Sequence, residues 1–318
     1  NLPNDKRILS STGILNINYI PPKLLVIGGG YIGLEMGSVF SAFGSEITVV
    51  EFLPTILPGA DSDLVKPLYL KLSNTFKNIY TSTKVMHIES KQDGLNVNFL
   101  KNDGTRFNEF FDIVLVSVGR IPNTEKLGLK NIGINTTQKG FISVNKNRQT
   151  DVDNIYAIGD ITGDPMLAHK ATHEGKVAAE IISGKLSSSF LPKAIPAVIF
   201  TDPEIAWAGK TESELKNDRI PYKKGEFPWK ASGRSIALNR FEGKTKILSH
   251  SDTGEILGVG IVGPNAGDLI GEAMLAIEMG ADAEDISLTI HPHPSLTETF
   301  SNAAEILDGT ITDLYIPK

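Results

Sequence analysis

The sequence contains no cysteine among its 318 residues. Disulfide scaffolds, thiolate metal sites, iron–sulfur clusters and cysteine nucleophiles are therefore excluded within these residues. An absence of cysteine suits a reducing compartment, so we expect a cytoplasmic location.

A basic segment and a long apolar run are missing as well. Lys and Arg number 31 against 37 Asp and Glu, which leaves no basic stripe for a nucleic acid. No apolar run approaches the roughly 18 residues of a membrane span, so no membrane partner is expected. The remaining composition, 41% hydrophobic and 21% charged, is typical of a globular protein, and the length predicts about two or three domains.

The clearest local pattern lies between residues 23 and 51. Lys23-Leu24-Leu25-Val26-Ile27 is a short apolar run typical of a buried parallel strand. Residues 31–43 have helical spacing of apolar side chains and end at Gly44, and residues 46–51 form a second apolar run. Strand, helix and strand in about thirty residues indicate a βαβ unit with a parallel sheet.

Weaker patterns predict the other elements. Residues 1–22 look irregular, and a helix is expected over 61–76, capped by Asp61 or Ser62 and kinked or shortened at Pro67. Strands are predicted at 84–89, 95–100, 106–110, 111–117 and 154–158, and a helix at 168–183. After a Ser- and Pro-rich linker, strands at 197–201, 244–249 and 256–262 and a helix at 266–279 indicate an α+β domain.

The segment Gly28-Gly29-Gly30-Tyr31-Ile32-Gly33 has the spacing G-x-G-x-x-G and joins a predicted strand to a predicted helix. In that context Gly28 permits a tight turn, Gly30 lets a pyrophosphate approach the backbone, and Gly33 lets helix and strand pack closely. Glu51, 18 residues after Gly33, ends the next strand and would bind a ribose diol while repelling a 2′-phosphate. The pattern therefore predicts a dinucleotide site that prefers NAD to NADP.

Two further motifs carry polar chemistry. Asp160 follows the predicted strand at 154–158 and would suit a sugar or ribityl hydroxyl, although many strands end in a Gly-Asp turn. His293 and Glu298 have the residue types of a general base and the carboxylate that orients it. Glu298 could instead form a capping box with Ser295.

Two histidine pairs are candidate metal sites. His291 and His293 are separated by one residue, and His169 and His173 by one helical turn. Neither pair has a carboxylate cluster beside it, and paired histidines are more often part of a solvated or packed face. We therefore expect no metal.

These residues, in this order, resemble the dihydrolipoamide dehydrogenases, which are FAD-containing pyridine nucleotide–disulfide oxidoreductases. The resemblance covers nearly the whole chain and rests on several separate motifs. They are Ser11-Thr12-Gly13, the glycine motif, Val118-Gly119-Arg120-Ile121-Pro122-Asn123, Ala157-Ile158-Gly159-Asp160, Pro165-Met166-Leu167-Ala168-His169-Lys170, Gly263-Pro264-Asn265-Ala266-Gly267 and His293-Pro294-Ser295-Leu296-Thr297-Glu298.

The resemblance implies a flavoenzyme that reoxidises protein-bound dihydrolipoamide and passes the electrons through FAD to NAD. It implies that His293, paired with Glu298, takes a proton from the dithiol in the active site of the opposite subunit of a homodimer. The implied partners are the lipoyl-bearing subunits of 2-oxo acid dehydrogenase complexes. The implied cofactor residues are Gly28, Gly30, Gly33, Glu35, Glu51, Val85 and Gly119 for NAD, with Glu35 near the nicotinamide, and Asp160, Met166, Leu167, Ala168 and His169 for FAD.

The chain departs from this family in one large respect. Members begin with another βαβ unit that binds FAD and with a redox-active cysteine pair, and this sequence has neither. We therefore expect an α/β protein with four segments: residues 1–13 as a remnant of the FAD domain, 14–123 as a Rossmann-like NAD-binding domain, 124–191 as a partial FAD-domain segment, and 192–318 as an α+β dimerisation domain. We expect such a fragment to be inactive by itself.

Other functions remain open from the sequence. The chain could be a non-catalytic module that binds NAD or forms a dimer. Glutathione reductase is a less suitable relative, because it uses NADPH and Glu51 would repel the extra phosphate. Mercuric reductase is excluded less firmly, although His293 with Glu298 fits the lipoamide enzyme better.

Overall fold

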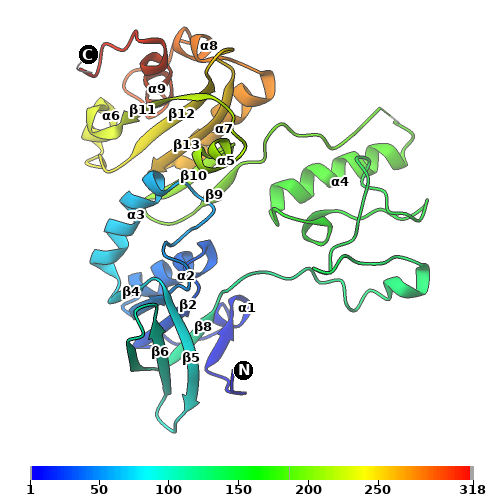
Figure 1. Cartoon of the computed structure of the whole chain (residues 1–318), viewed down its shortest axis with the longest axis vertical. Coiled ribbons are helices and arrows are strands. Elements are labelled where there is room, and N and C mark those ends of the chain that lie inside the picture. The colour runs from blue at the N-terminus through cyan, green and yellow to red at the C-terminus, as the bar shows by residue number, and fades with distance from the viewer. Residues whose placement is uncertain (1, 186, 316–318) are drawn as a thin grey trace. The chain divides into compact units, whose positions relative to one another are not determined.

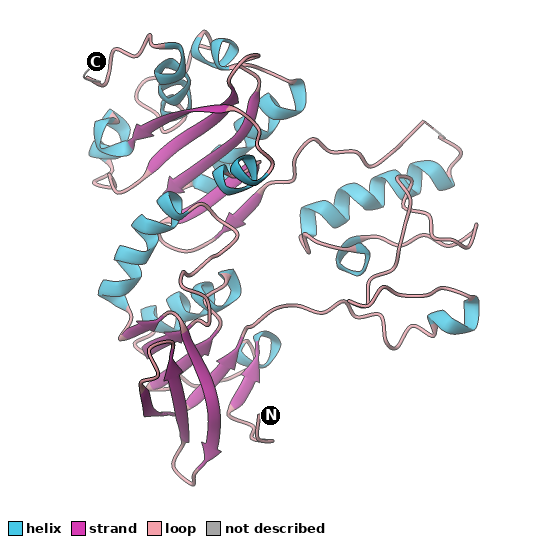
Figure 2. Cartoon of the chain, viewed as in Figure 1, coloured by secondary structure: helices cyan, strands magenta, loops and turns pink. Residues whose placement is uncertain are grey.

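The computed structural model describes residues 2–185 and 187–315. They fall into two compact units, divided after Val118 and before Pro196. The larger unit contains residues from both ends of the chain and three β-sheets, whereas the smaller unit consists of helices and loops (Figure 1, Figure 2). No helix among the described residues is long and apolar enough to cross a lipid bilayer.

A parallel five-stranded sheet forms the first part of the larger unit. Its order is β1 (Ile8–Ser10), β8 (Ile113–Val116), β2 (Lys23–Ile27), β3 (Glu46–Val50) and β4 (Asn78–Tyr80). The central strand β2 pairs in parallel with both β3 and β8. It alternates its side chains between two cores, so the apolar run at 23–27 is buried on both faces.

Two layers cover that sheet. On one face, Leu24 and Val26 share a core with α2 (Tyr31–Ala42) and α3 (Ser62–Thr75). On the other face, Leu25 belongs to a core with the antiparallel strands β5 (Thr83–Ser90), β6 (Leu95–Lys101) and β7 (Arg106–Phe111). The carboxyl ends of β2 and β3 are thereby left to carry the glycine loop and Glu51.

The C-terminal part of the larger unit is an antiparallel sheet with helices packed on it. The strand order is β11 (Tyr222–Pro228), β12 (Lys244–His250), β13 (Ile256–Gly263), β10 (Glu204–Gly209) and β9 (Ala197–Ile199). The helices of this part are α5 (Glu212–Asn217), α6 (Gly233–Ala237), α7 (Ala266–Met279), α8 (Ala283–Ser287) and α9 (Glu298–Asp308). A short 3-10 turn occupies Trp229–Ala231. The expected α/β class, with a parallel sheet and an α+β C-terminal part, is confirmed.

The smaller unit has helices and turns but, among its described residues, no β-strand longer than a single bridge. Its elements are the 3-10 turns Leu129–Ile132 and Gly159–Thr162 and the helix α4 (Ala168–Ile182). The strand predicted at 154–158 is therefore wrong. Tyr156 forms only a bridge to Gln149, and Ala157 packs in a small core with Ile134 and Ile142. An apolar run needs neighbouring strands to form a ladder, and the described residues of this unit supply none.

Two other predictions are corrected. Residues 1–22 are not irregular throughout, because Ile8–Ser10 form β1 and Ser11–Ile14 form the short helix α1, capped by the Ser10 hydroxyl. The pairing of β1 with β8 joins residues more than a hundred positions apart, so no local pattern announces it. Pro67 lies inside α3 and does not delay the start of the helix, while the alternative of a kink stays a prediction.

Candidate functional site

The glycine loop between β2 and α2 shows why each motif position has no side chain. Gly28 has φ +107°, and a Cβ there would lie 2.6 Å from the carbonyl oxygen of Ser117. A Cβ on Gly33 would lie 2.3 Å from the carbonyl oxygen of Gly28. No heavy atom lies within 4 Å of a Cβ built on Gly30, so that side of the loop is open to a ligand.

The first turn of α2 faces the same opening. Gly30 is the N-cap residue and brings no side-chain oxygen to the amides of the first turn. These amides and the positive end of the helix dipole suit an anion, as in other dinucleotide sites. The chain thus fits the pyrophosphate of a dinucleotide at this loop.

Glu51 lies against the loop, as its spacing predicts. Its carboxylate accepts hydrogen bonds from the amide of Gly29 at 2.7 Å and from the amide of Leu53 at 2.7 Å. The amide of Leu57 donates to the carbonyl of Gly29, so the segment after β3 closes over the loop. A carboxylate held this way keeps lone pairs for the hydroxyls of a ribose.

Glu35 is placed one turn into α2 but is neither solvated nor unpaired. Its Oε1 accepts a hydrogen bond of 2.9 Å from the amide of Phe200, which follows β9. Burial raises the pKa of Glu35, and the bond from Phe200 opposes that rise. The residue therefore links α2, which covers the parallel sheet, to the segment after β9 of the C-terminal sheet.

The remaining residues expected at the NAD site are placed less directly. Val85 is partly buried against the core that includes Phe99. It lies two residues after Thr83, and the Thr83 amide donates to the carbonyl of Glu51. Gly119 has φ +144° and belongs to the smaller unit. The roles of Val85 and Gly119 at the NAD site both stay predictions.

In the smaller unit, one arginine brings the residues expected at FAD together. The Arg120 guanidinium forms an ion pair with Asp160 and donates to the carbonyl of Met166 at 2.8 Å. Asp160 lies in the 3-10 turn Gly159–Thr162, and Met166 precedes α4. Leu167 is the N-cap residue of this 15-residue helix and brings no side-chain hydrogen bond, and Ala168 and His169 open its first turn.

A buried charge network stabilises the Gly159–Thr162 turn. Glu174 of α4 is fully buried, and its carboxylate accepts from the amide of Gly159 at 2.6 Å. Arg148 and Lys170 pair with the same carboxylate at 2.8 and 3.0 Å. The network holds the Gly159–Asp160 turn against α4, and no motif in the sequence indicated it.

The two histidine pairs weighed as metal sites are separated by the structure. His291 binds Glu272 on α7, whereas His293 binds Glu298 at the start of α9. His173 of the other pair contacts the ring of Phe190, with the centroids 5.8 Å apart. The nitrogens of His291 and His293 thus bind carboxylates on different helices, and the absence of a metal stays a prediction.

His293 and Glu298 form the expected base–carboxylate pair. His293 Nδ1 lies 2.8 Å from Glu298 Oε1, and the histidine side chain is 79% exposed. The second oxygen of Glu298 accepts from the amide of Ser295 at 2.6 Å. The capping contact and the histidine contact thus coexist, because the two oxygens of one carboxylate serve them separately.

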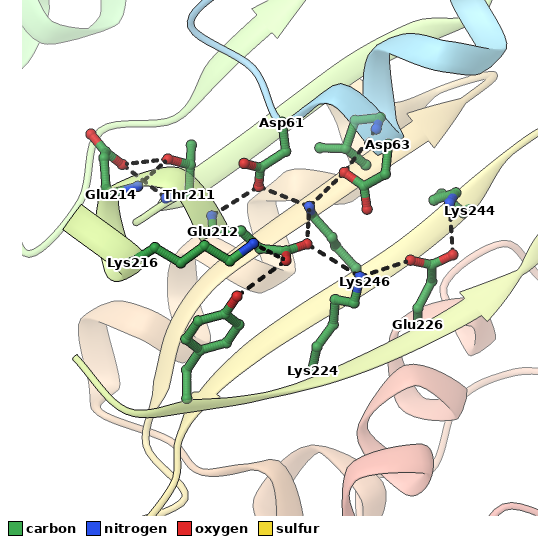
Figure 3. Close-up of polar contacts among 12 residues, drawn as sticks. Asp61, Asp63, Thr211, Glu212, Glu214, Lys216, Lys224, Glu226, Lys244 and Lys246 are labelled. Atoms are coloured by element: carbon green, nitrogen blue, oxygen red, sulfur yellow. Dashed lines mark hydrogen bonds and ion pairs between the residues drawn. The ribbon is translucent and has the colours of Figure 1, made fainter. Parts of the chain in front are cut away.

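One acidic cluster has the spacing of a cation site but already contains a cation. Asp61, Asp63 and Glu212 offer oxygens within 4.8 Å of one another. The Lys246 ammonium lies among them, at 2.8, 2.7 and 3.0 Å (Figure 3). Asp61 also accepts from the amide of Glu212 at 3.0 Å and gives no cap to its own helix. This cluster joins α3 to β12 and α5, so its role is structural.

Comparison with known proteins identifies the family. The sequence model described as pyridine nucleotide-disulphide oxidoreductase matches residues 2–175, and the dimerisation domain of the same family matches residues 195–304. The chain belongs to the pyridine nucleotide-disulphide oxidoreductases. Members of the family use FAD and NAD, the two cofactors expected from the sequence.

Similar members of the family carry one name. A dihydrolipoyl dehydrogenase of Vibrio cholerae is 49% identical over 98% of this chain and 65% of its own length. Those of Haemophilus influenzae and Buchnera aphidicola are 48% and 47% identical, again over 98% of the chain, and over 64% and 65% of their own lengths. The chain thus spans just under two thirds of the length of these curated relatives.

Solved structures with clear sequence similarity have the same fold. LpdA of Mycobacterium tuberculosis aligns with a TM-score of 0.86 at 26% identity, over 96% of this chain and 66% of its own. The HOCl-induced flavoprotein disulfide reductase RclA of Escherichia coli aligns with a TM-score of 0.86 at 25% identity, over 96% and 68%.

Several residues at these sites were not predicted from the sequence. Ser117 donates its hydroxyl hydrogen bond to the carbonyl of Ile27 at 3.0 Å and lies beside the Gly28 turn. Its position directly after β8, the neighbour of β2, is the only local signal. Glu174 and Glu272 had none, because both are ordinary helical glutamates in the sequence.

Proposed function

We propose that this protein is a dihydrolipoyl dehydrogenase, which reoxidises protein-bound dihydrolipoamide and passes the electrons through FAD to NAD. The observation that carries the proposal is the exposed His293 held by Glu298 at 2.8 Å, the pair that a proton transfer from a dithiol requires. Relatives of this name at 47–49% identity support it. A cytoplasmic location remains a prediction.

NAD would bind at the end of β2. The amides at the start of α2 would bind the pyrophosphate beside Gly28, Gly30 and Gly33, and the Glu51 carboxylate would accept from the ribose diol. Glu35, on the same helix, would lie near the nicotinamide, with Val85 and Gly119 lining the cleft. The opening above Gly30 supports this placement.

FAD would be held by the smaller unit, with Asp160 binding the ribityl chain and Met166, Leu167, Ala168 and His169 beside the flavin. The bound flavin supplies the step between two-electron thiol chemistry and hydride transfer. If the flavin lies beside these residues, the positive dipole end at the start of α4 would favour negative charge on it. Arg120 gathers the Asp160 turn and the Met166 carbonyl, so the residues present suit the ligand.

His293 would act as the base. Glu298 binds Nδ1 and thereby orients the imidazole so that its other nitrogen, Nε2, would face the substrate. Nε2 would take the proton of a thiol. The carboxylate stabilises the imidazolium that results. When the proton returns to solvent or product, the pair is restored.

A homodimer would bring this base to the active site of the partner subunit. The dimerisation domain covers residues 195–304, and large apolar side chains are exposed on and after α7, namely Leu275, Met279, Leu288 and Ile290. Exposed apolar side chains of this size are common in protein–protein interfaces. The further partners proposed are the lipoyl-bearing subunits of 2-oxo acid dehydrogenase complexes.

The thiols that exchange with dihydrolipoamide do not come from these 318 residues, which contain no cysteine. We expect the 318-residue chain alone to show no turnover with NAD and dihydrolipoamide, because nothing in it accepts the first electrons from the dithiol. Purified chain in a spectrophotometric assay for NADH tests this. Turnover above background would contradict the expectation.

The role of His293 is tested in the product of the complete gene. His293→Ala should slow dihydrolipoamide oxidation by about 10²–10⁴, the usual contribution of a general base, with NAD binding unchanged. His250→Ala, at the end of β12, is the matched control and should retain the rate. Wild-type turnover in His293→Ala would assign this residue to another role, and a failure of every form to oxidise dihydrolipoamide would favour a binding module.

A further inference from the structure

The segment that carries His293 is attached to helices on both sides. Before it, the ring of His291 bridges to Glu272 of α7. After it, Glu298 of α9 binds both His293 and the amide of Ser295. The sequence motif assigns a task to His293 and Glu298 only, and it leaves the bridge from His291 to Glu272 unexplained.

The protons of this bridge can be counted from its geometry. His291 Nδ1 lies 2.8 Å from the carbonyl oxygen of Thr289, which can only accept, so Nδ1 bears a hydrogen. Nε2 lies 2.6 Å from Glu272 Oε1. A neutral ring with its hydrogen on Nδ1 would set a lone pair against a carboxylate, so a proton must lie between Nε2 and Oε1. The bridge is a charge-assisted hydrogen bond.

Burial makes this bond strong enough to hold a loop. The His291 side chain is only 7% exposed and that of Glu272 32%, so water competes poorly for the shared proton. Charge-assisted bonds of this length are about twice as strong as neutral ones. His293, at 79% exposure, has no comparable burial to fix its position.

The backbone between the two histidines is stiff. Pro292 and Pro294 flank His293. Each proline ring fixes the φ angle of its own residue and restricts the backbone of the residue before it. A displacement of His291 is therefore passed along to His293 instead of being absorbed by free rotation. Anchoring His291 on α7 sets the direction from which His293 meets Glu298.

We propose that His291 and Glu272 are positioning residues, whose proton-bridged contact holds the loop so that His293 stays in register with Glu298. The proposal rests on the proposed function, in which His293 is the base, and adds a second histidine–carboxylate pair, which acts through His293. Thr289 contributes to this contact, because its carbonyl oxygen accepts from His291 Nδ1 and so fixes the hydrogen on that nitrogen.

The first test reads ring protonation directly, in the complete flavin-loaded protein with ¹⁵N-labelled histidine. Wild-type His291 should show one hydrogen on Nδ1 and a second, shared with Glu272, at Nε2. Glu272→Gln keeps a side chain that can donate to Nε2, and should give a neutral ring with its hydrogen on Nδ1. The matched control is Glu284→Gln, the same change at an exposed position of α8, which should leave the signals of both histidines unchanged. A singly protonated His291 in the wild type overturns the proposal.

The second test follows the consequence at His293. Glu272→Gln should shift the His293 ring signals and lower kcat by about 10- to 100-fold, the effect of a misplaced reacting group, with KM for NAD unchanged. If His293 signals and kcat match those of Glu284→Gln, the positioning role is wrong. Failure of the proposed function would show differently, as wild-type turnover in His293→Ala, whereas the His291 signals would still report on the bridge.

Discussion

At the scale of single residues, carboxylates do different work according to the groups that face them. Glu51 binds two backbone amides beside an open loop, Glu298 divides its oxygens between a histidine and an amide, and Glu35 is half-buried on one amide. Spacing in the sequence identified the first two. Glu35 was placed only by family resemblance, and its contact with Phe200 joins residues far apart in the chain.

Replacing Glu51 tests the ribose contact. Glu51→Ala should weaken NAD binding by about 1–3 kcal/mol, because a charged acceptor for the diol is lost. Calorimetric titration of the purified chain with NAD measures this. Glu46→Ala, at the opposite end of the same strand, should bind as the wild type does, and unchanged affinity in Glu51→Ala would remove the ribose role.

Glu35 should behave unlike an ordinary carboxylate as the pH changes. Burial raises its pKa in the folded state, so the folded protein binds this proton more tightly and ionisation above that pKa costs stability. Glu35→Gln should therefore be as stable as the wild type or gain less than about 1 kcal/mol near pH 7, since the amide oxygen can still accept from Phe200. Urea unfolding measures this, and a loss of more than about 1 kcal/mol would show that the charge itself stabilises the fold.

At the scale of elements, the turn from β2 to α2 contains one glycine that close packing requires and another that leaves room for a ligand. Gly33 is closed in by the backbone of Gly28, whereas Gly30 faces open space. The strand at 23–27 and the helix at 266–279 were predicted with the observed bounds, because each has a long local signal. The edge strand β11 was missed, since Lys223, Lys224 and Gly225 interrupt any apolar pattern.

Alanine at Gly33 should therefore lower mainly the stability of the protein, and alanine at Gly30 mainly its affinity for NAD. Gly33→Ala should destabilise the protein by about 1–3 kcal/mol through overpacking, because its Cβ would lie 2.3 Å from a carbonyl oxygen. Gly30→Ala should cost less than about 1 kcal/mol of stability but weaken NAD binding at least about tenfold, or 1.4 kcal/mol. Urea unfolding and NAD titration of both variants measure this. Equal NAD affinity in Gly30→Ala and wild type would mean that the pyrophosphate binds elsewhere.

At the scale of the whole molecule, Lys246 of the C-terminal sheet pairs with acidic residues at the start of α3, in the part that contains the parallel sheet. Its ammonium is 1% exposed and pairs with Asp61 and Asp63 from the first part and Glu212 from the second. Burial alone would raise the pKa of Glu212, but the bond and charge of Lys246, with the charge of Lys224, lower it to about 2. Gly260 adds to this contact, because a Cβ there would lie 2.4 Å from Leu64.

The cluster predicts how stability changes in acid. A depressed carboxyl pKa contributes stability above its ordinary value of 4.5, and that contribution is lost as the pH falls toward about 2. Lys246→Met should cost about 3–5 kcal/mol near pH 7, because three carboxylates lose their buried cation, and should flatten the decline between pH 4.5 and 2. Denaturant unfolding across pH measures both.

Lys244→Met is the matched control for Lys246→Met. Lys244 lies on the same strand and pairs with Glu226 at a more exposed position, so its loss should cost less than about 1 kcal/mol. Similar losses for both variants would show that the cluster does not hold the two parts together.

The sequence by itself determined the βαβ unit, the glycine loop, Glu51 and the pairing of His293 with Glu298, because each depends on residues close together in the chain. Tertiary structure decided the rest. Lys246 among its three carboxylates, Glu174 behind the Asp160 turn and His291 on Glu272 are contacts between segments whose local patterns are unremarkable. Burial and charge bring such residues together only after the layers have packed, so no spacing in the sequence encodes them.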